Sequence, residues 1–263
     1  MHADFYDLAL RVGVFLTEIL LTISLVRWMR AASRSNPEPI KFLLLIVFYG
    51  GLTAVVAAFV EIKYSFNITA LQKNTPALVN AYGTWYELIN NFAASAIEEM
   101  GKYMVAVFMV INTKHFHKLS DAILYLILIG LGFSLVEDVF FLINPATVPV
   151  YRLLSFYIHS GTSSIIGYAL GRFKFGLTSY GELVVSILGA IGLHFAYNLS
   201  TNVHNTTVAF YLAALITFYI SLQIFILFQR AIADEYTLEH LDKPLISHRL
   251  LNLKPKPTPT HTK

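Results

Sequence analysis

Long apolar stretches follow one another along the chain, and short polar segments separate them. A membrane-spanning helix needs about 20 consecutive, mostly apolar residues. Stretches of this length predict an all-α fold, a polytopic membrane bundle of about seven transmembrane helices. The expected spans are 8–29, 40–60, 88–112, 121–143, 151–171, 181–200 and 207–229.

Positively charged residues set the expected orientation of these spans. Cytoplasmic loops of membrane proteins carry an excess of lysine and arginine. Here such residues lie at or just after the ends of the first, third, fifth and seventh spans, at Arg27, Arg30, Lys114, Arg172 and Arg230. This alternation predicts an N-terminus outside and a C-terminus inside. We therefore expect a transmembrane helical domain over 1–230 and a disordered cytoplasmic tail over 231–263, which ends in a run rich in proline and lysine.

Composition supports a membrane protein and excludes some chemistry. The chain is 56% hydrophobic and 13% charged, whereas a soluble domain carries about 25% charged residues. It contains no cysteine, which excludes disulfides, thiolate metal ligands and a cysteine nucleophile. The net charge of +3 comes with the basic loops, so no nucleic-acid partner is expected. The expected partner is the lipid bilayer of the cell membrane, and the oligomeric state stays unknown.

Four of the spans carry polar residues where a membrane helix is normally apolar. An ionisable side chain at the bilayer centre costs at least about 2.5–3.5 kcal/mol. Such residues usually face the bundle interior, pair with one another and serve a function. The polar residues are Glu98, Glu99 and Lys102 in the third span, Glu137 in the fourth, His159 in the fifth, and His194 and Asn198 in the sixth, and the apolar Phe133 shares a helix face with Glu137.

The alternating direction of the spans places these residues at similar depths. With a rise of about 1.5 Å per residue, Glu98 lies about 15 Å from the outer edge, His159 about 12 Å, and Glu137 and His194 about 9 Å. We therefore expect one polar layer in the outer half of the membrane. Lys102 follows Glu98 by four residues on the same helix face, so Glu98 is its expected partner.

The polar set suits hydrolysis, and it also suits a metal. A buried glutamate can act as a general base on water, and histidine and asparagine can donate hydrogen bonds to a developing oxyanion. The same groups could instead bind Zn²⁺ with a water in an open position. The chain lacks a His-Glu-x-x-His motif, and the residues alone leave both mechanisms open. The candidate metal ligands are Glu98, Glu99, Glu137, His159 and His194.

At these residues the sequence resembles the PrsW family of intramembrane proteases, which is grouped with the CAAX prenyl endopeptidases and the scaffold subunit of gamma-secretase. Glu-Glu-x-x-Lys is matched by Glu98, Glu99 and Lys102, and Phe-x-x-x-Glu by Phe133 and Glu137. A single intramembrane histidine is matched by His159, and the last motif, His-x-x-x-Asp or Asn, by His194 and Asn198. The motifs occur in the family's order over roughly residues 90–200.

The resemblance implies an intramembrane endopeptidase in which glutamate activates water. Glu98 or Glu99 would be the base, assisted by Glu137, and His194 and Asn198 would form the oxyanion hole. The implied catalytic residues are thus Glu98, Glu99, Glu137, His159, His194 and Asn198, with Lys102 and Phe133 as structural support. No cofactor is expected in this mechanism, and zinc is the alternative. The implied substrate is a single-span membrane protein, such as an anti-sigma factor, cleaved near its extracytoplasmic end.

Two other functions remain open at this point. One is a non-catalytic membrane scaffold like the gamma-secretase subunit, which lacks the Glu-Glu pair found here at Glu98 and Glu99. The other is a proton- or ion-coupled transporter, because buried acids and histidines also form proton relays. Transporters often have internal repeats and interrupted spans, and neither is evident in this sequence.

Overall fold

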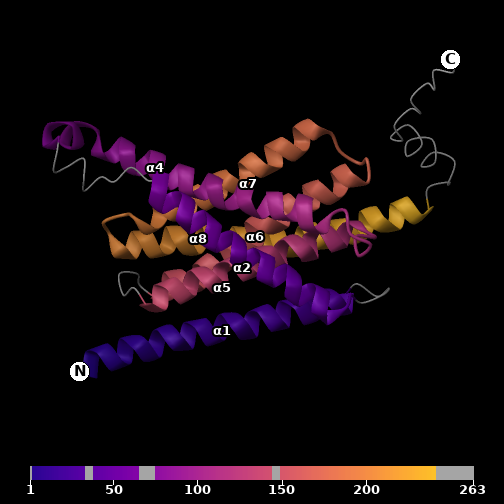
Figure 1. Ribbon diagram of the computed structural model, residues 1–263, viewed down its shortest axis with the longest axis horizontal. Coiled ribbons are helices and arrows are strands. Elements are labelled where there is room, and N and C mark those ends of the chain that lie inside the picture. The colour runs from indigo at the N-terminus through magenta and orange to yellow at the C-terminus, as the bar shows by residue number, and fades with distance from the viewer. Residues whose placement is uncertain (1, 33–37, 65–74, 144–148, 241–263) are drawn as a thin grey trace, which may run out of the picture.

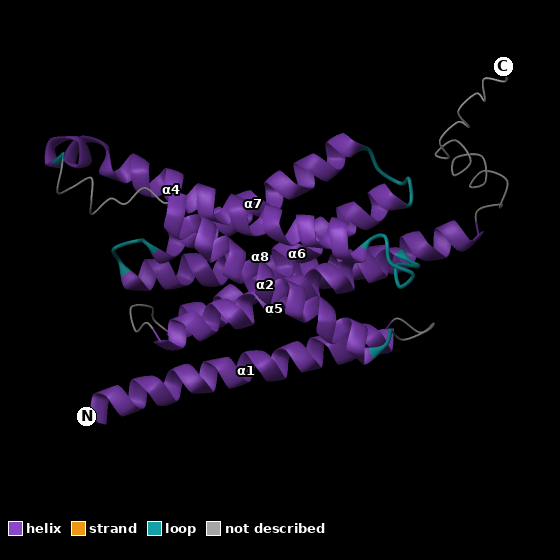
Figure 2. Ribbon diagram, in the orientation of Figure 1, coloured by secondary structure: helices purple, strands orange, loops and turns teal. Residues whose placement is uncertain are grey.

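The computed structural model describes residues 2–32, 38–64, 75–143 and 149–240, and these form a bundle of long helices (Figure 2). No strand occurs within the described ranges. The α-helices are α1 (His2–Ala32), α2 (Ile40–Tyr64), α4 (Pro76–Val105), α5 (Leu119–Ile143), α6 (Pro149–Lys174), α7 (Tyr180–Thr201) and α8 (Thr206–His240), and the π-helical segment η1 (Ala106–Val110) continues α4.

The helices run back and forth along the long axis of the bundle. The first turn of α1 and the last turn of α8 lie at opposite ends of the molecule (Figure 1). Successive helices therefore alternate in direction, as the order of the expected spans requires. An all-helical, multi-pass membrane protein is the architecture that results.

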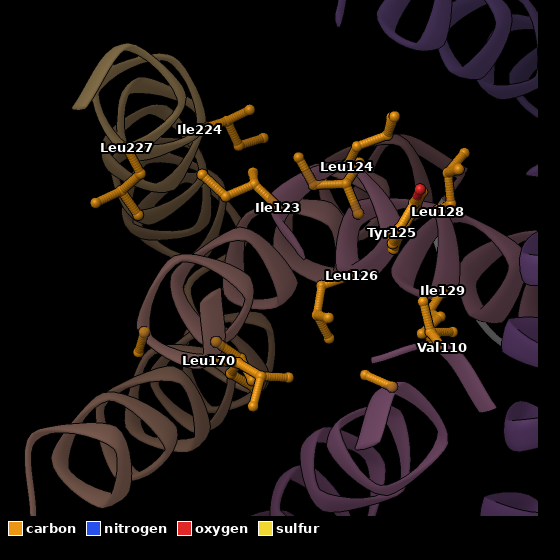
Figure 3. Packing of buried hydrophobic residues seen from close by; sticks show 14 of the residues in the cluster. Val110, Ile123, Leu124, Tyr125, Leu126, Leu128, Ile129, Leu170, Ile224 and Leu227 are labelled. Carbon is orange, nitrogen blue, oxygen red and sulfur yellow. The ribbon is translucent and has the colours of Figure 1, made fainter. Parts of the chain in front are cut away.

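Helix α5 forms the centre of the bundle because it is apolar on nearly every side. A helix that is hydrophobic all round is stable only when other helices surround it. Helices α2 and α6 pack on it most extensively, and α1, α4 and α8 contact it too. Figure 3 shows the side chains of Ile123, Leu126 and Ile129 at this centre, with Leu170 and Ile224 among their neighbours. The uniform hydrophobicity of α5 thus explains its central place.

Hydropathy alone identifies five of these helices as long and apolar enough to cross a membrane: α1, α2, α5, α7 and α8. Helices α4 and α6 fall outside that group because they carry many polar residues, among them Glu98, Glu99 and Lys102 on α4 and Arg152 and His159 on α6. Both have the length of a membrane span, with 30 and 26 residues. Among the described residues each of the seven expected spans falls on one α-helix, and five of these helices have the hydropathy of a membrane span.

Two expected boundaries differ from the structure. Helix α4 begins at Pro76 rather than near residue 88. Proline is well tolerated in the first turn of a helix, and the residues that follow Pro76 can continue the helix. Helix α8 continues from the expected end of the span through Ala231 to His240, so the first part of the expected tail is helical. The disorder expected farther along concerns residues 241–263, which lie outside the described residues.

Glycines allow the central helices to approach one another closely. A Cβ atom added at Gly132 of α5 would clash with the Val47 carbonyl oxygen of α2. A Cβ added at Gly130 would clash with the His159 carbonyl oxygen of α6. Small residues at such contacts bring backbones together in membrane bundles. Gly130 therefore sets the distance between α5 and the part of α6 that carries His159.

We expect Gly130→Ala to destabilise the protein by about 1–3 kcal/mol, because the added methyl group overpacks a backbone contact. The matched control is Gly192→Ala on α7, where an added Cβ meets nothing within 4 Å. Thermal unfolding in detergent would compare the two variants. Equal midpoints for both would contradict close packing of α5 against α6.

Candidate functional site

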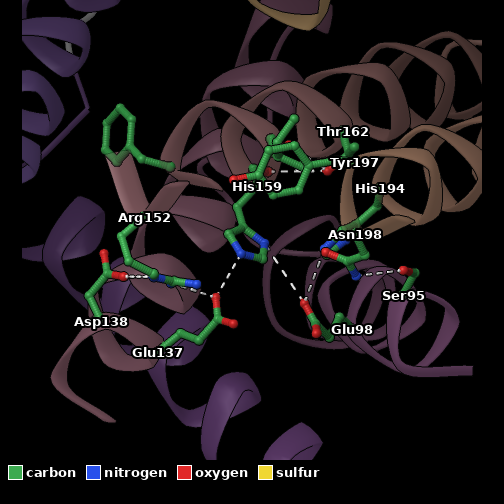
Figure 4. A network of polar contacts seen from close by, with 12 residues as sticks. Ser95, Glu98, Glu137, Asp138, Arg152, His159, Thr162, His194, Tyr197 and Asn198 are labelled. Atoms are coloured by element: carbon green, nitrogen blue, oxygen red, sulfur yellow. Dashed lines mark hydrogen bonds and ion pairs between the residues drawn. The ribbon is translucent and has the colours of Figure 1, made fainter. Parts of the chain in front are cut away.

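Four helices bring their polar residues to one place in the bundle. Helix α4 supplies Glu98, Glu99 and Lys102, and α5 supplies Phe133 and Glu137. Helix α6 supplies His159, and α7 supplies His194 and Asn198. Figure 4 shows Glu98, Glu137, His159, His194 and Asn198 turned toward one another. The residues expected at one depth are therefore in direct contact, although they lie far apart in the sequence.

Lys102 is fully buried and bonds to an acid on its own helix and to an imidazole on another. Its Nζ lies 2.8 Å from Glu99 Oε1 and 2.8 Å from His159 Nδ1. The expectation that Glu98 pairs with Lys102 was therefore wrong. Both glutamates lie within reach along the helix, but only at Glu99 does the ammonium group also meet His159. Lys102 thus joins α4 to α6.

The bond to Lys102 determines how His159 is protonated. An ammonium group only donates hydrogen bonds, so Nδ1 of His159 accepts and the ring proton lies on Nε2. That Nε2 donates to Glu137 Oε2 at 2.8 Å. The Phe133 ring covers this pair, with its centroid 4.6 Å from Lys102 Nζ and 5.0 Å from the His159 ring. Phe133 thus packs against both Lys102 and His159, and Glu137 fixes the orientation of His159.

His194 has the complementary arrangement on α7. Its Nδ1 donates to Glu99 Oε1 at 2.8 Å, and the Glu99 carboxylate accepts because Lys102 holds it ionised. The lone pair of His194 Nε2 then faces Glu98 Oε2, 3.7 Å away. Each histidine thus binds a carboxylate through one ring nitrogen and turns the other nitrogen toward Glu98.

Glu98 differs from the other acids of the site. Its Oε2 lies 3.9 Å from His159 Nδ1 and 3.7 Å from His194 Nε2. Within the described part of the chain, no group forms a hydrogen bond to this buried oxygen. Oε2 of Glu99 also has no partner among the described residues, but Oε1 of the same carboxylate binds Lys102 and His194, and Glu137 binds His159. Glu98 is therefore the carboxylate that its neighbours leave free to react.

A polar cavity of about 360 Å³ opens beside Glu98. A water molecule occupies about 30 Å³ in the liquid, so the cavity has room for roughly ten of them. Asn198 lies on its wall and donates through Nδ2 to Ser95 Oγ at 3.1 Å, which fixes the amide. The lining residues are Glu98, Glu137, Phe141, Tyr151, Arg152, Ser155, His194, Tyr197, Asn198, Thr201 and Asn202.

The sequence analysis did not single out Arg152, the second residue of the fifth expected span. The side chain is buried against α5, where Nη2 lies 3.0 Å from Glu137 Oε2 and Nε donates to Asp138 Oδ1. The sequence did contain a signal that could have identified Arg152 as a site residue. Glu137 and Asp138 near the end of one span, followed by Arg152 at the start of the next antiparallel span, lie at the same level. Ser95, which orients Asn198, gave no such signal.

The donor atoms for a metal ion also meet here. One carboxylate oxygen of Glu98 and one ring nitrogen each of His159 and His194 lie within 4.8 Å of one another. Catalytic zinc sites use two histidines and one glutamate in this way, with carboxylates on the far ring nitrogens. Glu99 and Glu137 occupy such outer places. These three residues therefore offer donor atoms of the right type, close enough together to bind a zinc ion, provided that Lys102 no longer binds Nδ1 of His159.

The sequence comparisons agree with the site. The family described as "PrsW family intramembrane metalloprotease" matches residues 38–228, which is most of the chain. The chain belongs to the PrsW family. The matched region includes α2 to α7 and most of α8, and it contains every residue named above for the site. Helix α1 precedes it.

One relative carries the family's name. Protease PrsW of Clostridioides difficile (strain 630) is 23% identical over 174 residues, which cover 63% of this chain and 68% of that protein. No solved structure matches the chain. Membership of the PrsW family confirms the resemblance seen in the motifs. It supports an intramembrane peptidase in a multi-pass protein of the cell membrane.

We expect Lys102→Met to destabilise this PrsW-family protein by about 3–5 kcal/mol, because it leaves the Glu99 carboxylate buried without its cation. The double variant Lys102→Met/Glu99→Gln should recover part of that loss. Lys174→Met is the matched control, since Lys174 is exposed and contacts Asn112 at 3.3 Å. Thermal unfolding in detergent measures all three. A single variant as stable as the control would contradict the buried pairing.

Proposed function

We propose that this protein is an intramembrane endopeptidase that hydrolyses a peptide bond of a membrane-anchored protein with water activated by Glu98. One observation carries the proposal. Glu98 lines a polar cavity together with Asn198, and its buried, unbonded Oε2 lies between two imidazoles. A hydrolase inside a membrane has to supply both water and a base, and this arrangement provides places for both.

The reaction would begin with a water molecule in the cavity. Glu98 removes a proton from it as the oxygen attacks the carbonyl carbon of the peptide bond. The proton can pass to His194 Nε2, 3.7 Å from Glu98 Oε2. It ends on the leaving nitrogen when the C–N bond breaks, so the products are a carboxyl group and an amine. Glu98 is regenerated without a covalent intermediate.

Asn198 and His194 would stabilise the oxyanion. The Asn198 amide has two N–H groups, and Ser95 Oγ accepts from only one of them. The second can donate to the carbonyl oxygen as negative charge develops there. His194 can donate from Nε2 only after that nitrogen has taken a proton. The two residues are four apart on α7, so their side chains lie on the same helix face.

The other acids and cations would position these groups. Glu99 sets the proton of His194 on Nδ1, and Lys102 holds Glu99 in place. Glu137 binds His159 and also borders the cavity, so it can assist in orienting the water. We therefore assign the base to Glu98 and keep Glu99 as the residue that orients His194.

The substrate proposal follows from the depth of the site. With the N-terminus outside, the cavity lies in the outer half of the membrane. A single-span protein would then be cut near its extracytoplasmic end, and the family resemblance implies a target such as an anti-sigma factor. The non-catalytic scaffold is the rival function, and it would bind such a helix without cutting it.

Zinc dependence is the second candidate mechanism, favoured by the grouping of Glu98, His159 and His194. Those three residues would hold the ion. When bound, it would polarise the substrate carbonyl and lower the pKa of a bound water. In either mechanism Glu99 and Glu137 orient the imidazoles, and Asn198 faces the cavity.

We expect Glu98→Gln to lower kcat about 10²- to 10⁴-fold, the usual contribution of a general base, without a change in the unfolding midpoint. The matched control is Glu87→Gln, an exposed glutamate on the same helix. Cleavage of a purified single-span substrate in liposomes measures both. Full activity in the Glu98 variant would refute the proposed base, and absence of cleavage in every protein, wild type included, would favour the scaffold.

Metal removal separates the two mechanisms. Because Lys102 occupies His159 Nδ1, we expect cleavage to survive dialysis against a chelator and metal analysis of the purified protein to give well below one ion per chain. A stoichiometric ion that is lost together with activity, and restored together with it by added Zn²⁺, would instead establish the metal-dependent mechanism. Activity of His159→Gln at each metal concentration provides the control.

A further inference from the structure

Helix α1 lies before the region that matches the family, yet it brings an acid into the bundle. Glu18 is fully buried, whereas Leu16 and Leu20 on either side are 53% and 65% exposed. Helix α1 packs on α5 and α6, with Glu18 on the contacting side. A carboxyl group in this apolar setting is costly unless it is neutral or has a partner.

The partner of Glu18 is another carboxyl group. Its side chain is within hydrogen-bonding distance of Asp138 on α5. No N–H or hydroxyl group among the described residues reaches either oxygen of Glu18 or Oδ2 of Asp138. Two facing carboxylates would repel each other, so they share one proton. Asp138 already binds Arg152 through Oδ1, so its Oδ2 is the oxygen left to accept a hydrogen bond from a protonated Glu18.

Asp138 connects Glu18 to the site through a continuous series of bonds. Arg152 Nε donates to Asp138 Oδ1, and Arg152 Nη2 donates to Glu137 Oε2 at 3.0 Å. The same oxygen of Glu137 accepts from His159 Nε2 at 2.8 Å. Figure 4 shows the part of this series from Asp138 to His159. A change in Asp138 therefore shifts Arg152, and Arg152 sets the position of Glu137.

A second residue of α1 supports this contact. Arg11 lies seven residues before Glu18, about two helical turns, and therefore on a similar face. It is buried and its Nη1 lies 3.4 Å from the Phe141 carbonyl oxygen of α5. Arg11, Asp138 and Arg152 also border a small cavity between α1, α5 and α6. The polar side of α1 thus faces the outer ends of α5 and α6, where the site is.

We infer that Glu18 is a positioning residue of the peptidase: as a neutral acid it donates a hydrogen bond to Asp138 and thereby holds Arg152 and Glu137 in place for His159. The inference rests on the proposed hydrolytic function. It extends the site to a helix outside the family match. Glu18 does not touch the cavity, so it acts through Asp138 and Arg152.

The test compares substitutions that keep or remove the donor. Glu18→Gln retains an N–H donor toward Asp138 and cannot ionise, so its kcat should stay within about threefold of wild type. Glu18→Leu removes the donor and should lower kcat about 10- to 100-fold, the usual effect of losing such an outer partner, with KM nearly unchanged. Thr17→Val, at an exposed neighbour on α1, is the matched control. All are assayed on the single-span substrate in liposomes, per folded protein.

The outcomes separate this inference from the proposed function. If the wild type cleaves and Glu18→Leu keeps full kcat, the positioning role is refuted while the peptidase stands. If Gln fails to rescue what Leu loses, the donated hydrogen bond is refuted.

Infrared spectroscopy gives a readout that needs neither cleavage nor the Leu variant. The wild type should have a carbonyl stretch of protonated carboxylic acids to which Glu18 contributes, and Glu18→Gln should have a weaker band. Identical spectra would overturn the inference even if no protein in the series cleaves a substrate.

Discussion

The site depends on one constraint: charge inside a membrane must be paired within the protein. An unpaired buried charge costs several kcal/mol, and helix α4 and its neighbours contain several acids at one level. Lys102 binds Glu99 and Arg152 binds both Glu137 and Asp138. These two cations therefore pair with three of the acids, Glu99, Glu137 and Asp138. Among the described acids on α4 and α5 at this level, Glu98 is left without a cation in contact, and it is the one that borders the cavity.

The bonds that pair these buried charges also connect the helices, so charge pairing and helix packing depend on each other. Lys102 on α4 reaches His159 on α6, and Glu99 on α4 reaches His194 on α7. Arg152 on α6 reaches the acids of α5. Close glycine contacts bring α5 near enough for these bonds to form. A shift of one helix would therefore leave several groups unpaired at once, which explains how a site made from four separate helices keeps its geometry.

The sequence was sufficient for the helices and for the level of the site. Long apolar stretches predict spans by length alone, and the alternating direction of spans places Glu98, Glu137, His159 and His194 at one depth. The sequence was not sufficient to predict which charged residues pair with each other. Lys102 follows Glu98 by four residues and Glu99 by three, and both spacings allow a contact on a helix. The choice depends on His159, whose position is set by the packing of α6. Arg152 was overlooked for the same reason, because an arginine near a helix end is exposed or buried according to its neighbours in space.

A membrane-spanning helix needs apolar residues, whereas the site needs charged ones, and α1 and α4 combine the two in different ways. Helix α4 carries Glu98, Glu99 and Lys102 within one turn and loses the hydropathy of a typical span. Helix α1 carries Glu18 alone in its centre and keeps that hydropathy. One neutral acid is tolerated in such a helix at moderate cost, whereas an ionised one needs a cation beside it. The proton that Glu18 shares with Asp138 therefore lets an outer, mostly lipid-facing helix contact the polar centre without adding a charge to it. A contact of this kind joins α1 to the site by a hydrogen bond and leaves Arg152 to balance Glu137 and Asp138.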